Sequence, residues 1–154
     1  MSKQQLTEIL KISAQNPPPQ NATPPMMRAW AEGITSHTPL AQSVRVTRSS
    51  FGPYRGDLIL PDGGDASRLI IYYHGGGFFL FSSHTYRVTT TNLARATGIA
   101  VFAPDYRLAP ENPAPAAHDD AFDVYRYALK QGHAADKIAL SGDSAGGNLA
   151  LATA

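Results

Sequence analysis

One glycine-rich pentapeptide, Gly142-Asp143-Ser144-Ala145-Gly146, carries the residue of this chain that is best suited to nucleophilic chemistry. A short apolar run precedes it and small, helix-compatible residues follow it, so the pattern predicts a strand, a tight turn and a helix. Such a turn holds its central residue in a strained conformation, which small neighbours permit. We interpret Ser144 as a nucleophile presented at the end of a sheet, with Asp143 in a supporting role. The alternative is an ordinary turn of small residues.

Three consecutive glycines, Gly75-Gly76-Gly77, directly follow the apolar run 69–73. Without side chains, their N–H groups can face a pocket and donate to a negative charge that develops on a substrate oxygen. We expect Gly75, Gly76 and Ala145 to supply these N–H donors. A phosphate-binding loop is excluded because the sequence has neither a Gly-Lys-Ser/Thr ending nor Gly-x-Gly-x-x-Gly spacing here.

The elements that must position these groups alternate between strands and helices. Continuous apolar runs predict strands covered on both faces, and helical patterns closed by Gly98 and Gly132 predict the helices between them. This alternation is typical of a mostly parallel sheet in the α/β class. Before it, residues of alternating polarity on either side of a turn at 50–54 predict an antiparallel pair. The expected strands are 69–73, 99–103 and 138–141, and the expected helices are 84–97, 115–131 and one that follows the pentapeptide and includes 148–154.

Residues 1–40 have apolar residues at helical spacing, interrupted by prolines, and are predicted to form a helical cap segment. The α/β core is predicted at 41–154. One short amphipathic helix is expected before Pro17, and a second from Pro24 to Gly33, where the glycine would cap it. The large apolar residues of the second helix are interpreted as packing this segment onto the core, or alternatively as lining a substrate pocket. These residues are Met26, Met27 and Trp30.

Composition excludes several classes of function. With 43% hydrophobic and 16% charged residues over 154 positions, the chain can bury a core and is not disordered. The net charge is +1 and the sequence has no long run of one sign, so no basic segment indicates binding to nucleic acid or to an anionic membrane. The absence of cysteine excludes disulfides, thiolate metal sites and cysteine nucleophiles. No signal peptide or run of membrane-spanning length is present, so we expect a soluble, cytoplasmic protein.

Three segments in this order, 72–78 (YYHGGGF), 105–111 (DYRLAPE) and 142–149 (GDSAGGNL), resemble the motifs of the hormone-sensitive-lipase-like carboxylesterases of the α/β-hydrolase superfamily. The resemblance covers the N-terminal half of such a protein and implies a partial α/β-hydrolase fold. It implies hydrolysis of short- to medium-chain acyl esters through an acyl-enzyme on Ser144, without cofactor or metal, and a cap over the acyl pocket. It also implies an ionic scaffold near the site, made of Asp105, Arg107 and Glu111.

The catalytic acid and the histidine of this fold follow the serine along the chain. The ten residues after Ser144 contain no Asp, Glu or His. His74 is predicted to anchor the glycine loop rather than to act as the base, and the other histidines to be solvated or capping residues. A serine without a base is a poor nucleophile, so the isolated chain is expected to be inactive. The other histidines are His37, His84, His118 and His133.

Three hypotheses follow from these residues. The chain is the N-terminal half of a carboxylesterase, or one subunit of a split hydrolase whose partner chain brings the acid and the histidine, or a non-catalytic remnant that binds a small acyl ligand or another protein. In each case the sheet is expected to end at the strand 138–141, whose open edge favours self-association or pairing with a complementing chain.

Overall fold

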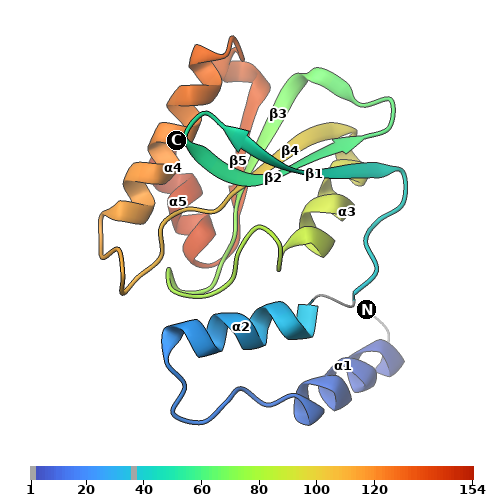
Figure 1. Cartoon of the computed structure of the whole chain (residues 1–154). Coiled ribbons are helices and arrows are strands. Elements are labelled where there is room, and N and C mark those ends of the chain that lie inside the picture. The colour runs from blue at the N-terminus through green and yellow to red at the C-terminus, as the bar shows by residue number, and fades with distance from the viewer. Residues whose placement is uncertain (1–2, 36–37) are drawn as a thin grey trace.

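The computed structural model describes residues 3–35 and 38–154, and it has the α/β architecture that the sequence predicts (Figure 1). Helices and strands alternate along the second part of the chain, as the apolar runs indicated. In chain order the elements are α1 (Lys3–Gln15), α2 (Pro24–Thr35), β1 (Val44–Phe51), β2 (Tyr54–Pro61), β3 (Asp65–Tyr73), α3 (Arg87–Thr97), β4 (Ile99–Pro104), α4 (Ala116–Lys130), the 3-10 turn η1 (Ala135–Lys137), β5 (Ile138–Gly142) and α5 (Ala145–Thr153).

The described residues form a five-stranded sheet in the order β1-β2-β4-β3-β5. β3 runs parallel to both of its neighbours, β4 and β5, whereas β1 and β2 form the predicted antiparallel pair. β2 is also antiparallel to β4, so the sheet is parallel through three strands and antiparallel through the other two. β5 lies at one edge of the sheet and is paired on its β3 side alone within the part of the chain that is described.

Both faces of β3 are covered, which explains its uninterrupted apolar sequence. Successive side chains of a strand point to opposite faces. Ile71 therefore packs in a cluster with Val124 of α4 and Leu149 of α5, whereas Ile70 packs in a second cluster with Ala94 of α3. Figure 1 shows α4 and α5 on one side of the sheet and α3 on the other. The sheet edge that carries the carboxyl ends of β3, β4 and β5 is thus supported from both sides.

Two predicted helix boundaries are wrong. Gly33 lies inside α2 without a positive φ, and the helix continues to Thr35, so Gly33 does not cap it. α3 begins at Arg87 rather than at 84, because residues 82–85 form a turn that is held by side-chain hydroxyl groups. In this turn the Ser82 N–H donates to Thr85 Oγ1 at 2.9 Å, and the Thr85 N–H donates to Ser82 Oγ at 3.3 Å.

Helices α1 and α2 lie next to each other, outside the two helical layers of the sheet (Figure 1). Leu6 and Leu10 of α1 are 43% and 60% exposed, so these two leucines are not covered by the rest of the protein. The boundary of a cap segment at residue 40 stays a prediction. Among the described residues, none of the helices combines the length and the apolar character that crossing a membrane requires.

Candidate active site

The predicted strand, turn and helix around Ser144 are present. β5 ends at Gly142 and α5 begins at Ala145, so that Ser144 lies between them with φ 50° and ψ −119° and is exposed. A positive φ is strained for a residue with a side chain and persists where the surrounding structure fixes it. Close packing provides this constraint, because a Cβ atom at Gly146 would overlap the carbonyl oxygen of Tyr73 at the end of β3.

The glycine loop, residues 74–78, follows β3 and approaches this turn. The Gly75 N–H donates to Asp143 Oδ1 at 3.1 Å, so this predicted oxyanion donor is engaged by a carboxylate. Gly76 adopts a φ of 109°, and its N–H has no acceptor among the described residues. The N–H of Ala145 is likewise without an acceptor there, because the first N–H groups of a helix have no partner within it. Two of the three predicted donors are therefore free.

Asp143 joins the turn to two other elements. Its Oδ1 accepts a hydrogen bond from the Tyr72 hydroxyl at 3.1 Å, besides the one from Gly75, and its Oδ2 accepts one from the Tyr86 hydroxyl at 2.8 Å. Burial and, after it, the nearby carboxylate raise the pKa of Tyr86 to about 12, and the same causes raise the pKa of Tyr72. Both phenols are therefore neutral hydrogen-bond donors at neutral pH. The contacts give Asp143 a positioning role beside Ser144.

His74 is buried, with 1% of its surface exposed, and its contacts are those of an anchor. Its Nδ1 lies 2.7 Å from the carbonyl oxygen of Gly75, so Nδ1 carries the proton that it donates. The ring stacks on Tyr106 with centroids 4.4 Å apart, and the Tyr106 hydroxyl donates to the carbonyl oxygen of His74 at 2.6 Å. Burial lowers the pKa of His74, so a neutral imidazole holds the glycine loop.

None of the described histidines contacts Ser144, whose Oγ has no hydrogen-bond partner among the residues of 3–35 and 38–154. His84 is exposed and lies 3.9 Å from a carboxylate oxygen of Glu32. His118 is half-buried and its Nε2 lies 2.9 Å from Oδ1 of Asn148 in α5, a contact that the sequence did not predict. Of the remaining two, His37 falls outside the described residues and His133 follows the end of α4.

The three charged residues of the segment 105–111 all form ion pairs, as the interpretation as an ionic scaffold predicts. Each pairs with a different element, and the partners come from β1, α4 and α2. The segment is therefore held by ion pairs at three separate points. The pairs are Asp105 with Arg48, Arg107 with Asp120 at 2.7 Å, and Glu111 with Arg28 at 2.8 Å.

Arg28 of α2 belongs to no motif that could be recognised in the sequence. Its Nε donates to the carbonyl oxygen of Phe79 at 2.8 Å, and its Nη2 donates to that of Ala109, also at 2.8 Å. The guanidinium also binds both carboxylate oxygens of Glu111, at 3.0 and 2.8 Å. By contrast, Met26 is 51% exposed. The α2 helix is therefore attached beside the glycine loop through Arg28 rather than through Met26.

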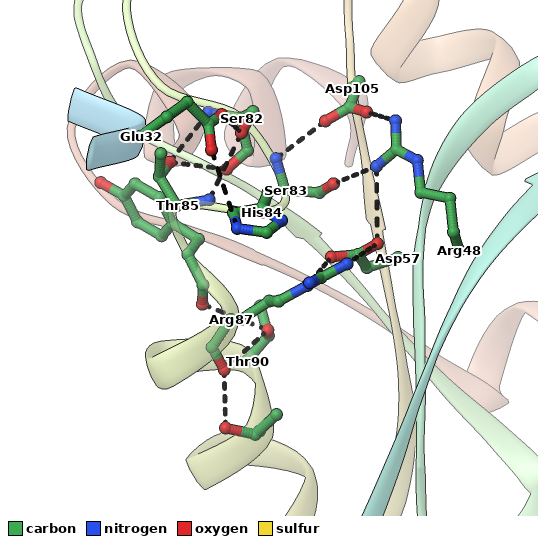
Figure 2. Close-up of polar contacts among 12 residues, drawn as sticks. Glu32, Arg48, Asp57, Ser82, Ser83, His84, Thr85, Arg87, Thr90 and Asp105 are labelled. Atoms are coloured by element: carbon green, nitrogen blue, oxygen red, sulfur yellow. Dashed lines mark hydrogen bonds and ion pairs between the residues drawn. The ribbon is translucent and has the colours of Figure 1, made fainter. Parts of the chain in front are cut away.

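A buried carboxylate, Asp57 on β2, organises a second polar cluster that the sequence did not reveal. Asp57 is fully buried and accepts hydrogen bonds from Arg87 at 2.6 and 3.1 Å and a longer contact from Arg48 at 3.5 Å. Arg48 also donates to Ser83 Oγ at 2.7 Å and pairs with Asp105 at the end of β4, as Figure 2 shows. Two guanidiniums thus keep a buried charge compensated, and the cluster fixes the turn that precedes α3.

Comparison with known proteins agrees with this geometry. The profile of the α/β-hydrolase fold family matches residues 70–154. An esterase of Acinetobacter venetianus is 39% identical over 144 residues, which is 94% of this chain and 47% of the relative. The hormone-sensitive lipase of Mus musculus is 40% identical over 87 residues, which is 54% of this chain and 12% of the relative.

Solved structures give the same result. A crystal structure of an esterase from the bacterial hormone-sensitive lipase family has a TM-score of 0.91 at 32% identity and covers 99% of this chain and 52% of its own. A hormone-sensitive lipase from a metagenome library has a TM-score of 0.89 at 38% identity, with 99% and 51% covered. The chain thus spans about half the length of these relatives. It belongs to the α/β-hydrolase fold family, among the hormone-sensitive-lipase-like carboxylesterases.

Proposed function

We propose that the chain carries the nucleophile and the oxyanion-binding groups of a carboxylic ester hydrolase that acts on short- to medium-chain acyl esters. The observation that carries the proposal is the strained backbone of Ser144 at the start of α5, beside the free N–H groups of Gly76 and Ala145. Relatives named esterase and hormone-sensitive lipase support this class of reaction. We interpret this arrangement as a nucleophile elbow next to an oxyanion hole.

In the proposed reaction the Ser144 oxygen attacks the carbonyl carbon of the ester and its proton passes to a base. The carbonyl oxygen becomes an oxyanion that the N–H groups of Gly76 and Ala145 stabilise. The bond to the alkoxy oxygen then breaks, and the alcohol leaves with the proton from the base. Water attacks the acyl-enzyme in the same way and releases a carboxylic acid. Gly75 can join as a third donor if its N–H leaves Asp143.

The base and its acid are proposed to come from polypeptide other than these 154 residues. The support is that none of the described side chains hydrogen-bonds to Ser144 Oγ and that the relatives are about twice as long as the span they share with this chain. Such a segment, in the same chain or in a complementing one, would adjoin the open side of β5 next to the elbow.

A chimera tests this proposal. Residues 1–154 are joined to the part of the Acinetobacter venetianus esterase that lies beyond its matched region, and hydrolysis of p-nitrophenyl butyrate is measured. We expect turnover by the chimera that Ser144→Ala lowers by a factor on the order of 10³ or more, because loss of a nucleophile leaves only binding and the oxyanion hole. The isolated chain should show no turnover above its own Ser144→Ala variant.

A folded chimera whose hydrolysis does not depend on Ser144 would contradict the proposal and favour a non-catalytic binding role. Folding is checked by circular dichroism and by a cooperative urea transition, so that an inactive chimera is interpreted only when it is folded.

A further inference from the structure

A cavity of about 250 Å³ lies between the glycine loop, the segment 107–114 and the first turn of α4. Alanine methyl groups and a phenylalanine ring provide most of its walls, and Ala117, which is 6% exposed, belongs to the apolar core below it. Polar side chains line it as well, among them that of Arg107, which pairs with Asp120. The other lining residues are Gly77, Phe78, Ala109, Asn112, Ala114, Ala117 and His118.

The cavity is joined to the nucleophile turn through two contacts. The ring of His118 lies 5.6 Å from that of Phe78, which directly follows the three glycines, and the His118 Nε2 donates to Asn148 Oδ1 at 2.9 Å. The backbone N–H of Asn148 in turn donates to the carbonyl oxygen of Ser144 at 3.1 Å. One wall of the cavity is therefore braced against the first turn of the helix that Ser144 begins.

We propose that this cavity binds one apolar arm of the ester and that His118 limits the length of that arm. The proposal rests on the function proposed above, which it deepens by assigning a place for the hydrocarbon part of the substrate. A volume of about 250 Å³ lies below the range of roughly 300–1,000 Å³ that is usual for drug-sized ligands, so the arm is a short alkyl chain. Each buried CH₂ group is expected to strengthen binding roughly fourfold until the cavity is full.

His118 is suited to set this limit because its ring is held on both sides. Phe78 contacts one side, and the hydrogen bond to Asn148 fixes the ring at its Nε2 edge. A tryptophan at this position would fill the cavity, and an alanine would open its wall. Asp119, its exposed neighbour on α4, does not line the cavity and provides the matched control.

Binding is measured without catalysis, by ¹H–¹⁵N correlation spectra of the 154-residue chain in its Ser144→Ala form. Two series of probes are titrated, namely ethyl esters of increasing acyl length and acetate esters of increasing alkoxy length. We expect saturable shifts at Gly77 and His118, with affinity that rises along one series and then stops rising. The series that shows this dependence identifies the bound arm as acyl or alkoxy.

His118→Trp should weaken binding of the preferred ester at least tenfold, His118→Ala should move the length limit to longer chains, and Asp119→Trp should leave both unchanged. His118→Phe, a smaller intrusion, is used if the tryptophan variant does not unfold cooperatively. Absence of saturable shifts at these amides, or equal affinity in folded His118 and Asp119 variants, would overturn the inference.

The two proposals fail separately. One outcome is that esters bind with the expected chain-length dependence but the chimera shows no hydrolysis that depends on Ser144. In that case the cavity is a ligand site and the proposed esterase function is wrong. The other outcome is that the His118→Trp and Asp119→Trp chimeras both hydrolyse esters through Ser144 and prefer the same chain length. In that case the esterase function stands and the cavity has no role in chain-length preference.

Discussion

At Ser144, main-chain atoms of neighbouring elements hold the backbone in its strained conformation. A Cβ atom at Gly146 would overlap the carbonyl oxygen of Tyr73, whereas at Gly147, one residue later in the same helix, its nearest contact would be 3.5 Å away. The two glycines are adjacent in α5, but only Gly146 lies against the main chain of β3. The first is required by packing between α5 and β3, and the second is not.

A comparison of alanine variants tests this difference. Gly146→Ala is expected to lower the free energy of unfolding by about 1–3 kcal/mol or more, because the added methyl group separates α5 from β3. Gly147→Ala should leave it unchanged or raise it by up to about 1 kcal/mol, because alanine favours the helix. Urea titrations followed by circular dichroism measure both. Equal stability of the two variants would show that the close contact at Gly146 does not constrain the elbow.

Residues whose role is set by near neighbours could be predicted from the sequence, and residues paired over long range could not. Ser144 and the glycines around it are defined by a pattern of five positions. Asp57 and Arg28 carry no such pattern, because Arg87 lies 30 residues from Asp57 and Glu111 lies 83 residues from Arg28. The contact of His118 with Asn148 could not be predicted for the same reason, since the two residues lie 30 positions apart.

Among the elements, α2 is attached to the rest of the protein through Arg28, which makes most of its polar contacts, and through Glu32, which accepts a hydrogen bond from Ser82. Arg28 connects α2 to Phe79, Ala109 and Glu111 with four hydrogen bonds, two of them to main-chain carbonyl oxygens. The carboxylate of Glu111 has its pKa lowered, first by the hydrogen bond from Arg28, so the pair is charged at neutral pH. α2 should therefore detach before the sheet unfolds if the Arg28 side chain is removed.

Hydrogen exchange tests this expectation at the level of the element. Arg28→Ala should increase exchange in α2 (Pro24–Thr35) and leave the protection of β3 and β4 unchanged, because opening there is local. Arg126→Ala, which removes an exposed pair with Asp123 on α4, is the control and should not affect α2. Unchanged exchange in α2 of the Arg28 variant would show that other contacts hold the helix.

The secondary structure was predicted well where periodicity and terminal residues agreed. The apolar run 69–73 predicted the end of β3 correctly, although the strand begins four residues earlier, at Asp65. The glycine after α3 predicted the end of that helix, and Gly98 adopts the expected left-handed φ of 66°. The start of α3 was missed because hydroxyl groups of Ser82 and Thr85 satisfy the backbone of the preceding turn. The order of the strands in the sheet could not be predicted from the sequence pattern, because β4 lies between β2 and β3 although it follows both along the chain.

At the scale of the whole molecule, the sheet of the described residues has two edge strands, β1 and β5, and the one beside the nucleophile turn is β5. β5 is paired on one side within the described residues, and Leu151 on the adjoining helix is 83% exposed. Unpaired strand edges and large exposed apolar side chains favour association with another chain. The isolated chain is therefore expected to self-associate through this edge.

Sedimentation velocity over a range of concentrations tests the prediction. We expect the wild-type chain to sediment as dimers or larger species and Leu151→Lys to shift the distribution toward monomer, because a charge opposes burial of that surface. Thr89→Lys, an exposed position on α3, is the control and should not change the distribution. A monomer at all concentrations, with cooperative unfolding, would contradict the expectation.

The hydrogen bonds to Asp143 also set an order in time for the assembly of the site. Synthesis proceeds from the N-terminus, so Gly75 is made 68 residues before the aspartate that accepts its N–H, and Tyr72 is made 71 residues before it. Until β5 has left the ribosome, β3 has an unpaired side and the glycine loop lacks the contact to Asp143. Closures over such separations are slow. The nucleophile turn can therefore take its place beside the glycine loop only after β5 has been made and has paired with β3.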